Sequence, residues 1–208
     1  MPTDELPLDV FLQNDDALHV AADGQMLLAS SGRCPPVKAI LPGSFNPIHR
    51  GHWELALVAE QIVGHPIAFE ISVANVDKPP LDGDAVRARL APFNWQASVW
   101  LTHSPRFAQK AERFPGATFV VGVDTALRIV SPRYYGDNPA AMLAALGRMR
   151  DLECRFLVAC RVDAQGKCLQ VGDVPIPPAF AMLFQEIPAE QFRWDISSTQ
   201  LRAQGSSI

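Results

Sequence analysis

Short apolar runs alternate along the chain with segments whose apolar residues recur at helical spacing. A strand that is followed by a helix and then by another strand requires a crossover connection, which favours a mainly parallel sheet with helices on both faces. We therefore predict an α/β fold with a doubly wound sheet. Strands are expected at 37–41, 67–76, 97–102, 118–123, 154–162 and 183–187, and helices at 52–63, 85–93, 106–114, 140–150 and from about 124.

The first part of the chain has a different pattern. Asp23 and Gly24 lie between two apolar runs, which is typical of a tight turn, so residues 17–30 are expected to form a small β-hairpin. Residues 31–36 have the composition of a linker. We expect an N-terminal extension over 1–36 and a main domain over 37–208. Residues 163–180 are rich in turn formers and are expected to be irregular.

Composition limits the classes of partner. The 208 residues are 48% hydrophobic, which allows a full core, and the formal net charge is −4. This charge disfavours electrostatic binding to nucleic acid or to an acidic membrane. Without a run long enough for a signal peptide or a membrane span, the expected location is the cytoplasm. The four cysteines, Cys34, Cys154, Cys160 and Cys168, lack metal-ligand spacing and are expected to be free thiols.

The segment GSFNPIHRGH, residues 43–52, lies between the strand at 37–41 and the helix that follows. In a parallel sheet the first strand-to-helix loop commonly forms a ligand site. Gly43 would let the backbone approach a ligand closely, and the amides of Ser44 and Phe45 would then point at phosphate oxygens. Asn46 would add a side-chain donor.

His49 and His52 are three residues apart at the expected start of that helix, so both imidazoles should project to one side. Two such donors beside a helix N-terminus suit an anion whose charge grows during a reaction. A metal half-site is the first alternative, although no third ligand lies at a matching spacing. The second alternative is that both histidines only cap the helix or face solvent.

A second polar segment, Ile196 to Arg202, reads ISSTQLR. Ser197, Ser198 and Thr199 would place hydroxyls and free amides at a helix start, and Arg202 would follow one turn later, within reach of the same anion. The alternative is an ordinary Ser/Thr cap with a solvated arginine.

Together GSFNPIHRGH and ISSTQLR resemble the two signatures, His-x-Gly-His and Ile-Ser-Ser-Thr-x-x-Arg, of the nucleotidyltransferase superfamily. Within it, the chain is most similar to the nicotinamide-mononucleotide adenylyltransferases and the proteins grouped with them. The resemblance covers about residues 37–205 and implies a Rossmann-like nucleotidyltransferase domain. It also implies that Ile196 and its hydroxyl neighbours bind nucleotide, and that Gly122 and Asp124, in FVVGVDTALR, contact the ribose or base.

The binding site for the second substrate is less clear from the sequence. Lys78, in NVDKPPLD, is one of four lysines and would neutralise an acceptor phosphate, unless it is simply a solvated turn residue. The acceptor pocket is expected to involve loops 75–83, 92–106 and 131–139. Trp95, Trp100, Tyr134 and Tyr135 are candidates for ring stacking, although each is more often a core residue.

These motifs predict an enzyme that transfers AMP from ATP to a phosphorylated acceptor, such as nicotinate or nicotinamide mononucleotide, and releases pyrophosphate. Catalytic roles are expected for His49, His52, Lys78 and Arg202. Mg²⁺ would be held through the nucleotide phosphates rather than by a protein cage. A nucleotide sensor without catalysis, a CTP-dependent transferase and a hydrolase of the activated product remain alternatives, and a homo-oligomer is compatible with the sequence.

Overall fold

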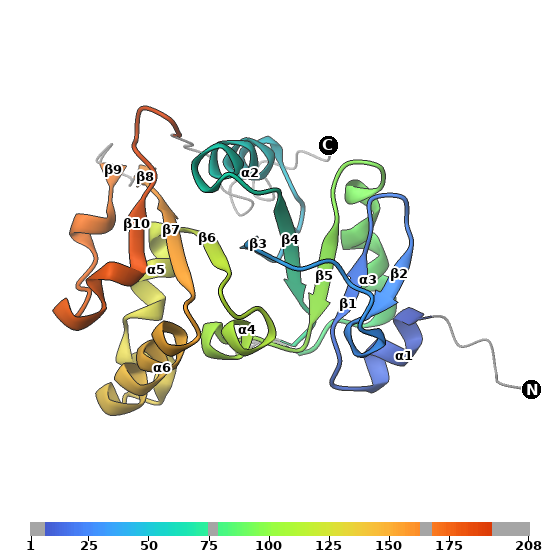
Figure 1. Ribbon diagram of the computed structural model, residues 1–208, viewed down its shortest axis with the longest axis horizontal. Helices are drawn as coiled ribbons and strands as arrows, with labels where there is room; N and C mark the ends of the chain where they lie inside the picture. Colours follow the sequence, from blue (N-terminus) through green and yellow to red (C-terminus); the bar gives the residue numbers. More distant parts are fainter. Residues whose placement is uncertain (1–6, 75–78, 163–167, 193–208) are drawn as a thin grey trace, which may run out of the picture.

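The computed structural model describes residues 7–74, 79–162 and 168–192. Figure 1 shows a twisted sheet with helices on both faces. The helices are α1 (Pro7–Gln13), α2 (Arg50–Val63), α3 (Gly83–Leu90), α4 (Phe107–Arg113), α5 (Val123–Ile129) and α6 (Pro139–Asp151). The strands are β1 (Leu18–Val20), β2 (Met26–Leu28), β3 (Ala39–Pro42), β4 (Ile67–Ser72), β5 (Val99–Thr102), β6 (Thr118–Gly122), β7 (Arg155–Ala159), β8 (Arg161–Val162), β9 (Cys168–Leu169) and β10 (Phe184–Glu186).

The main sheet has eight strands in the order β10-β7-β6-β3-β4-β5-β1-β2. From β10 to β5 every neighbouring pair is parallel, and β1 and β2 add an antiparallel edge. The chain runs outward from β3 to β5 and then returns to the other side of β3 with β6. This reversal makes the carboxyl ends of β3 and β6 the expected place for a ligand. The predicted doubly wound α/β fold is therefore confirmed.

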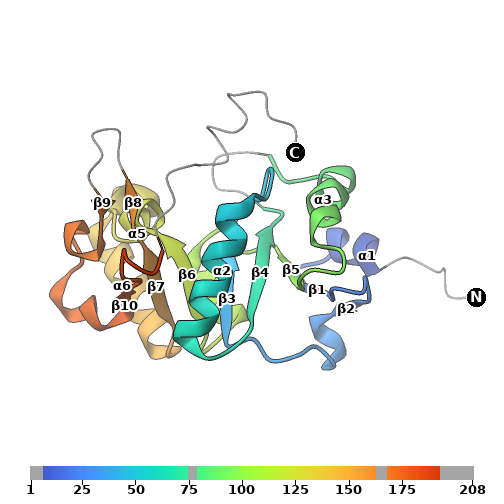
Figure 2. The same ribbon diagram turned by 90° about the horizontal axis from the view of Figure 1, so that it is seen from above.

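Alternation of side chains along the central strands produces two separate cores. Val120 of β6 and Leu157 of β7 belong to the cluster under α2 and α3, whereas Phe119 and Phe156 belong to the cluster under α4 and α6. In Figure 2, α2 lies along β3 and β4, which it contacts. Because both faces of the strands are covered, their sequences are almost continuously apolar.

Helix ends follow local chemistry. The Asp82 carboxylate accepts a hydrogen bond from the amide of Ala85 at 2.8 Å, so α3 begins two residues before the predicted 85. Gly64 ends α2 with φ of 69°, a left-handed conformation that favours glycine. Short 3-10 turns follow or precede several elements, at Ala29–Ser31, Ala91–Phe93, Pro132–Tyr135, Val171–Asp173 and Pro178–Leu183.

The predicted hairpin is confirmed, and it continues the main sheet. Ala21 donates to Gln25 across the Asp23–Gly24 turn, and β1 pairs with β5. The sequence pattern missed α1, which is only two turns long; its Phe11 is fully buried and contacts the ring of His103. The boundary between 1–36 and 37–208 stays a prediction.

Two expectations near the C-terminal half need correction. The strand predicted over 154–162 is divided, because Cys160 separates β7 from β8 and β8 turns away to pair with β9. The segment 168–180, expected to be irregular, contains β9 and two 3-10 turns. The last predicted strand is present as β10, parallel to β7.

Phe11→Ala tests whether the N-terminal segment contributes to the main core. The variant should lower the free energy of unfolding by about 3 to 5 kcal/mol, because it empties a fully buried site. Urea denaturation measures the change. Leu57→Ala is the control, since Leu57 is 62% exposed and should change stability by less than about 1 kcal/mol. Equal effects in both variants would contradict the packing of α1.

Candidate functional site

The loop after β3 is anchored by an aromatic ring. Phe45 is buried and packs edge-on against the rings of His52, Phe69 and Phe93, at centroid distances of 5.0, 5.4 and 5.5 Å. A Cβ at Gly43 would lie 2.6 Å from Cζ of this ring. Glycine is therefore required by packing inside the loop, and the same packing directs the exposed Ser44 away from the core.

The two histidines of the motif lie together, as predicted. His49 precedes the first residue of α2 and His52 lies in its first turn, and their ring centroids are 3.8 Å apart. His52 Nδ1 accepts a hydrogen bond from the backbone amide of His49 at 3.2 Å. Because Nδ1 is the acceptor, the proton of the neutral ring lies on Nε2, which leaves Nε2 as the donor. His49 Nδ1 is buried without a hydrogen-bond partner among the described residues.

Both rings are neutral bases in this arrangement. Burial, together with the neighbouring His49, lowers the pKa of His52 to about 3. Burial also lowers the pKa of His49. In the free protein the pair therefore offers N–H groups and no positive charge.

A pocket of about 280 Å³ opens beside this loop, at the carboxyl ends of the central strands. Gly43 and Ser44 form one wall, and β4, α3, α4, α5 and the 3-10 turn Pro132–Tyr135 supply the others. The pocket lies at the topological switch point, where α/β sheets bind ligands. The residues that face it from these other elements include Glu70, Ser72, Arg89, Arg106, Lys110, Thr125, Arg128, Tyr134 and Tyr135.

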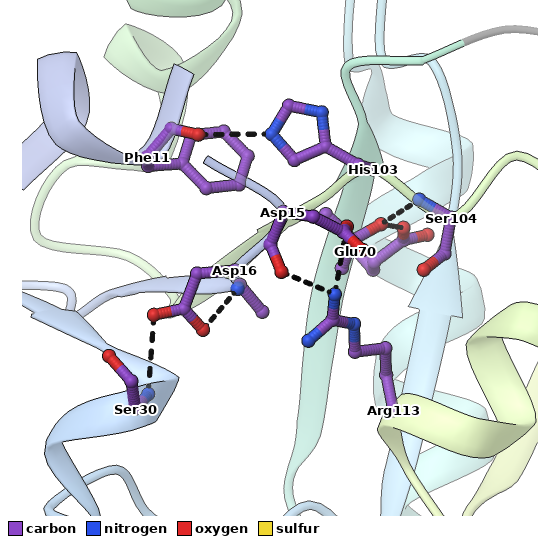
Figure 3. Close-up of polar contacts among 10 residues, drawn as sticks. Phe11, Asp15, Asp16, Ser30, Glu70, His103, Ser104 and Arg113 are labelled. Atoms are coloured by element: carbon purple, nitrogen blue, oxygen red, sulfur yellow. Dashed lines mark hydrogen bonds and ion pairs between the residues drawn. The ribbon is translucent and has the colours of Figure 1, made fainter. Parts of the chain in front are cut away.

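A buried ion pair lies against this pocket. Lys110 Nζ lies 2.7 Å from both carboxylate oxygens of Glu70, and the Thr102 hydroxyl donates to Glu70 Oε1 at 2.5 Å. Thr102 Oγ1 in turn accepts from the Ser104 amide at 3.2 Å. Figure 3 shows Glu70 and Ser104 close together where β4 and β5 end. Each charge is satisfied inside the protein, as burial requires.

The same view shows how the N-terminal segment is attached near this cluster (Figure 3). Arg113 of α4 lies 2.9 Å from the Asp15 carboxylate, and the His103 ring is hydrogen-bonded to the Phe11 carbonyl at 3.0 Å. The end of β5 is thus held by Glu70 through Thr102, and the next residue, His103, is held by α1.

The other nominated residues are placed differently. Gly122 precedes α5, and Asp124 in its first turn forms an ion pair with Arg161 of β8. Asn46 is exposed and does not line the pocket. Lys78, Ile196, Ser197, Ser198, Thr199 and Arg202 lie outside the described residues.

The four ring-stacking candidates separate into two groups. Tyr134 and Tyr135 line the pocket, and the Tyr135 hydroxyl donates to the carbonyl of Ile129 at 2.9 Å. Trp100 is buried between His19 and Phe114 in the core, and Trp95 is 80% exposed away from the pocket. Only the tyrosines are therefore positioned to contact a ligand there.

Sequence reasoning missed the charged residues around the pocket. Glu70 had a usable signal, because it is a charged residue inside the apolar run IAFEIS. Lys110 and the three arginines had none, since each lies at an ordinary polar position of a predicted helix or loop. Their convergence depends on how α3, α4 and α5 pack against the sheet.

Comparison with known proteins gives the context for this site. No family model matches the sequence. Over 178 residues the chain is 27% identical to a probable nicotinate-nucleotide adenylyltransferase of Gloeobacter violaceus, an alignment that covers 79% of this chain and 82% of the relative. The chain resembles the nicotinate-nucleotide adenylyltransferases. The resemblance predicted from the two motifs is confirmed, and the relative belongs to the predicted class of enzyme, the nucleotidyltransferases.

The chain is also similar to solved structures. One of them is the Plasmodium falciparum nicotinic acid mononucleotide adenylyltransferase complexed with NaAD. The two sequences are 18% identical, the TM-score is 0.45, and the alignment covers 81% of this chain and 83% of the solved chain. Among the described residues, no cluster of three or more His, Cys, Asp or Glu side chains is arranged to hold a metal ion. In the same residues, no helix combines the length and apolarity needed to cross a membrane.

The lowered pKa of His52 predicts an acid-dependent loss of stability. Below about pH 6.5 unfolded His52 binds a proton, whereas folded His52 stays neutral until about pH 3. The free energy of unfolding should therefore fall by up to about 1.4 kcal/mol per pH unit from this group as pH decreases through that window. Denaturant titrations from pH 7 to 4 measure the slope. His52→Asn keeps an acceptor for the His49 amide and should make the slope shallower; an unchanged slope would contradict the assignment.

Breaking the Glu70–Lys110 pair should be costly. Lys110→Met leaves the Glu70 carboxylate buried without its cation and should reduce the free energy of unfolding by about 3 to 5 kcal/mol. Adding Glu70→Gln to this variant should recover most of the loss, because no unpaired charge remains. Arg148→Met is the control, since the Arg148–Glu112 pair is more than half exposed and should contribute less than about 1 kcal/mol. A small loss in Lys110→Met would argue against a buried pair.

Proposed function

We propose that this protein is an adenylyltransferase that transfers AMP from ATP to a pyridine mononucleotide and releases pyrophosphate. The observation that carries the proposal is the adjacent pair of rings of His49 and His52 at the start of α2, which follow the loop whose Gly43 and Ser44 line the pocket. The motif resemblance and the 27% identical relative, named a probable nicotinate-nucleotide adenylyltransferase, support the same chemistry.

The reaction needs no covalent enzyme intermediate. An oxygen of the acceptor phosphate attacks the α-phosphorus of ATP, a new P–O bond forms, and the bond to the bridging oxygen of the β-phosphate breaks. Phosphoryl chemistry of this kind depends on positioning and on stabilisation of charge. The pocket would position the substrates, and the donors at the start of α2 would stabilise the charge.

The described histidines would stabilise the phosphates. The Nε2–H of His52, held by the hydrogen bond at Nδ1, would donate to an α-phosphate oxygen, and His49 would donate beside it. These dipoles are already oriented in the free protein, so little reorganisation is needed as charge builds. Gly43, Ser44, Phe45 and Asn46 would contribute donors from the same loop.

Further contacts come from residues proposed on the motif resemblance. Ser197, Ser198, Thr199 and Arg202 would hold the β- and γ-phosphates, with Ile196 beside them, and Lys78 would bind the acceptor phosphate. Gly122 and Asp124 would contact the ribose, where Asp124 would be shared with Arg161.

Mg²⁺ would enter with the triphosphate. Glu70 and Asp124, the carboxylates at the ends of the central strands discussed above, each already hold a cationic side chain. With these carboxylates occupied, the site fits an Mg²⁺ ion bound by phosphate oxygens and water better than an Mg²⁺ ion bound in a protein cage. The ion would supply charge neutralisation on the triphosphate.

His52→Ala should lower turnover by about 10² to 10³, the usual cost of removing one preorganised donor. The measurement is pyrophosphate release from ATP, and separately from CTP, with nicotinate and nicotinamide mononucleotide as acceptors. His65→Ala is the control, because His65 is exposed beyond the end of α2. Thermal unfolding should show that both variants are folded. Near wild-type turnover in His52→Ala would contradict the role of His52.

A sensor without catalysis would give a different result. In that case calorimetry would detect ATP binding to the wild-type protein, but pyrophosphate would not be released with any of the acceptors. Release only from CTP would favour the cytidylyltransferase alternative.

A further inference from the structure

The loop after β3 contains a residue with an unusual backbone conformation. Phe45 has φ of 39°, in the left-handed region that residues other than glycine adopt only at a cost. Its ring folds back over Gly43 and is buried. A strained backbone persists only where the surrounding structure holds it, and such residues cluster at ligand sites. The contacts that hold Phe45 in this conformation therefore bear on what the loop does.

The buried ring alone does not fix the peptide that precedes it. A half-turn of the Ser44–Phe45 peptide plane changes ψ of Ser44 and φ of Phe45 but leaves both side chains almost in place. It would take φ of Phe45 to about −141°, in the β region that any residue adopts. The relaxed orientation is therefore compatible with the same packing of the ring, and a second contact is needed to hold the observed orientation.

Arg89 supplies that contact. It extends from α3, and its Nη1 donates a hydrogen bond to the carbonyl oxygen of Ser44 at 2.9 Å. The helix is held against the loop, because the ring of Phe93, in the 3-10 turn after α3, lies 5.5 Å from the ring of Phe45. A guanidinium makes a charge-assisted hydrogen bond, which is stronger than a neutral one. The aromatic packing thus holds the side chain of Phe45, and the guanidinium holds the peptide before it.

The same hydrogen bond sets the direction of an amide. In a trans peptide the C=O and the N–H point in opposite directions, so the Phe45 N–H is turned away from Arg89. Among the described residues, the Phe45 amide has no hydrogen-bond partner. The carbonyl, which would repel an anion, is therefore paired with a cation, and the N–H is left as a donor.

We infer that Arg89 is a positioning residue, which holds the Ser44–Phe45 peptide so that the Phe45 amide stays available to an oxyanion. The inference rests on the proposed function, in which this loop contributes donors to phosphate oxygens. Without Arg89 the peptide reorients, φ of Phe45 relaxes, and the Ser44 carbonyl takes the place of the N–H. The loop then loses a donor and gains a repulsive oxygen at the same position, although the aromatic contacts remain.

The orientation of the peptide is tested first, in crystals of the ligand-free protein. Arg89→Met keeps most of the side-chain length but cannot donate, so φ of Phe45 should move from near 39° to the β region. Arg89→Lys retains a donor and should keep the wild-type orientation. Arg87→Met is the matched control and should leave φ unchanged, because Arg87 forms exposed ion pairs with Asp9 and Asp84 and does not line the pocket. Thermal unfolding should show that all three variants are folded.

Anion binding is measured next, by calorimetry with inorganic triphosphate as the probe. Apparent affinity falls in proportion to the fraction of molecules that keep the binding-competent orientation. We expect about one molecule in ten of Arg89→Met to keep it, so Kd for triphosphate should rise about tenfold. Arg89→Lys should restore most of the affinity. In the transfer assay Arg89→Met should raise KM for ATP and change kcat little, because the amide binds phosphate both before and during transfer.

The outcomes separate positioning from a direct contact between Arg89 and phosphate. A direct contact would also weaken binding in Arg89→Met but would leave φ of Phe45 at its wild-type value, and that result would overturn the inference. A reoriented peptide with an unchanged Kd for triphosphate would overturn it as well, and so would a wild-type φ in the β region.

The inference and the proposed function can fail separately. Reorientation in Arg89→Met with a matching rise in Kd, both reversed in Arg89→Lys, would support the inference whether or not pyrophosphate is released from ATP. If no acceptor gave release in the wild-type protein, the proposed transfer reaction alone would fail.

Discussion

The ring of Phe45 joins the central strand to the candidate site. It packs between Gly43 of its own loop, Phe69 of β4, Phe93 after α3 and the edge of His52. Because this ring is buried, the loop cannot move without opening the core beneath it. Ser44 is consequently held at the pocket wall and the backbone amide of His49 is held against His52. The donors at the start of α2 are therefore positioned by hydrophobic packing as well as by helix geometry.

On the opposite face of the sheet, apolar packing again fixes the position of a polar side chain. Along β4, Phe69 and Ile71 point into the core under α2, so the intervening Glu70 must point toward α4. There it meets Lys110 and Thr102 in a pair that is almost completely buried. A pocket floor made of satisfied charges is rigid and neutral as a unit. The imidazole pair thus lies at the start of α2, whereas the pocket beside the loop is lined by residues of α3, α4 and α5 from both faces of the sheet.

Much of the fold was predictable because the apolar periodicities of strands and of helices each depend on residues that are close in sequence. Apolar strands, amphipathic helices and the Asp23–Gly24 turn each depend on residues that are neighbours in sequence. The pairing of His49 with His52 followed from a three-residue spacing for the same reason.

The missed α1 and the division of the strand predicted over 154–162 have a common cause. Short elements are decided by what they pack against, as when β8 leaves the sheet to pair with β9.

By itself, the sequence determined the strand–helix order, the hydrophobic faces and the pairing of the two imidazoles in residues 43–52, since these depend on contiguous residues and on backbone geometry. Only the tertiary structure decided that Arg89, Arg106 and Arg128 converge, that Glu70 and Lys110 form a closed pair, and that Trp100 is a core residue while Tyr134 lines the pocket. Such long-range relations depend on strand order and on the packing of helices across the sheet, and no local pattern encodes either one.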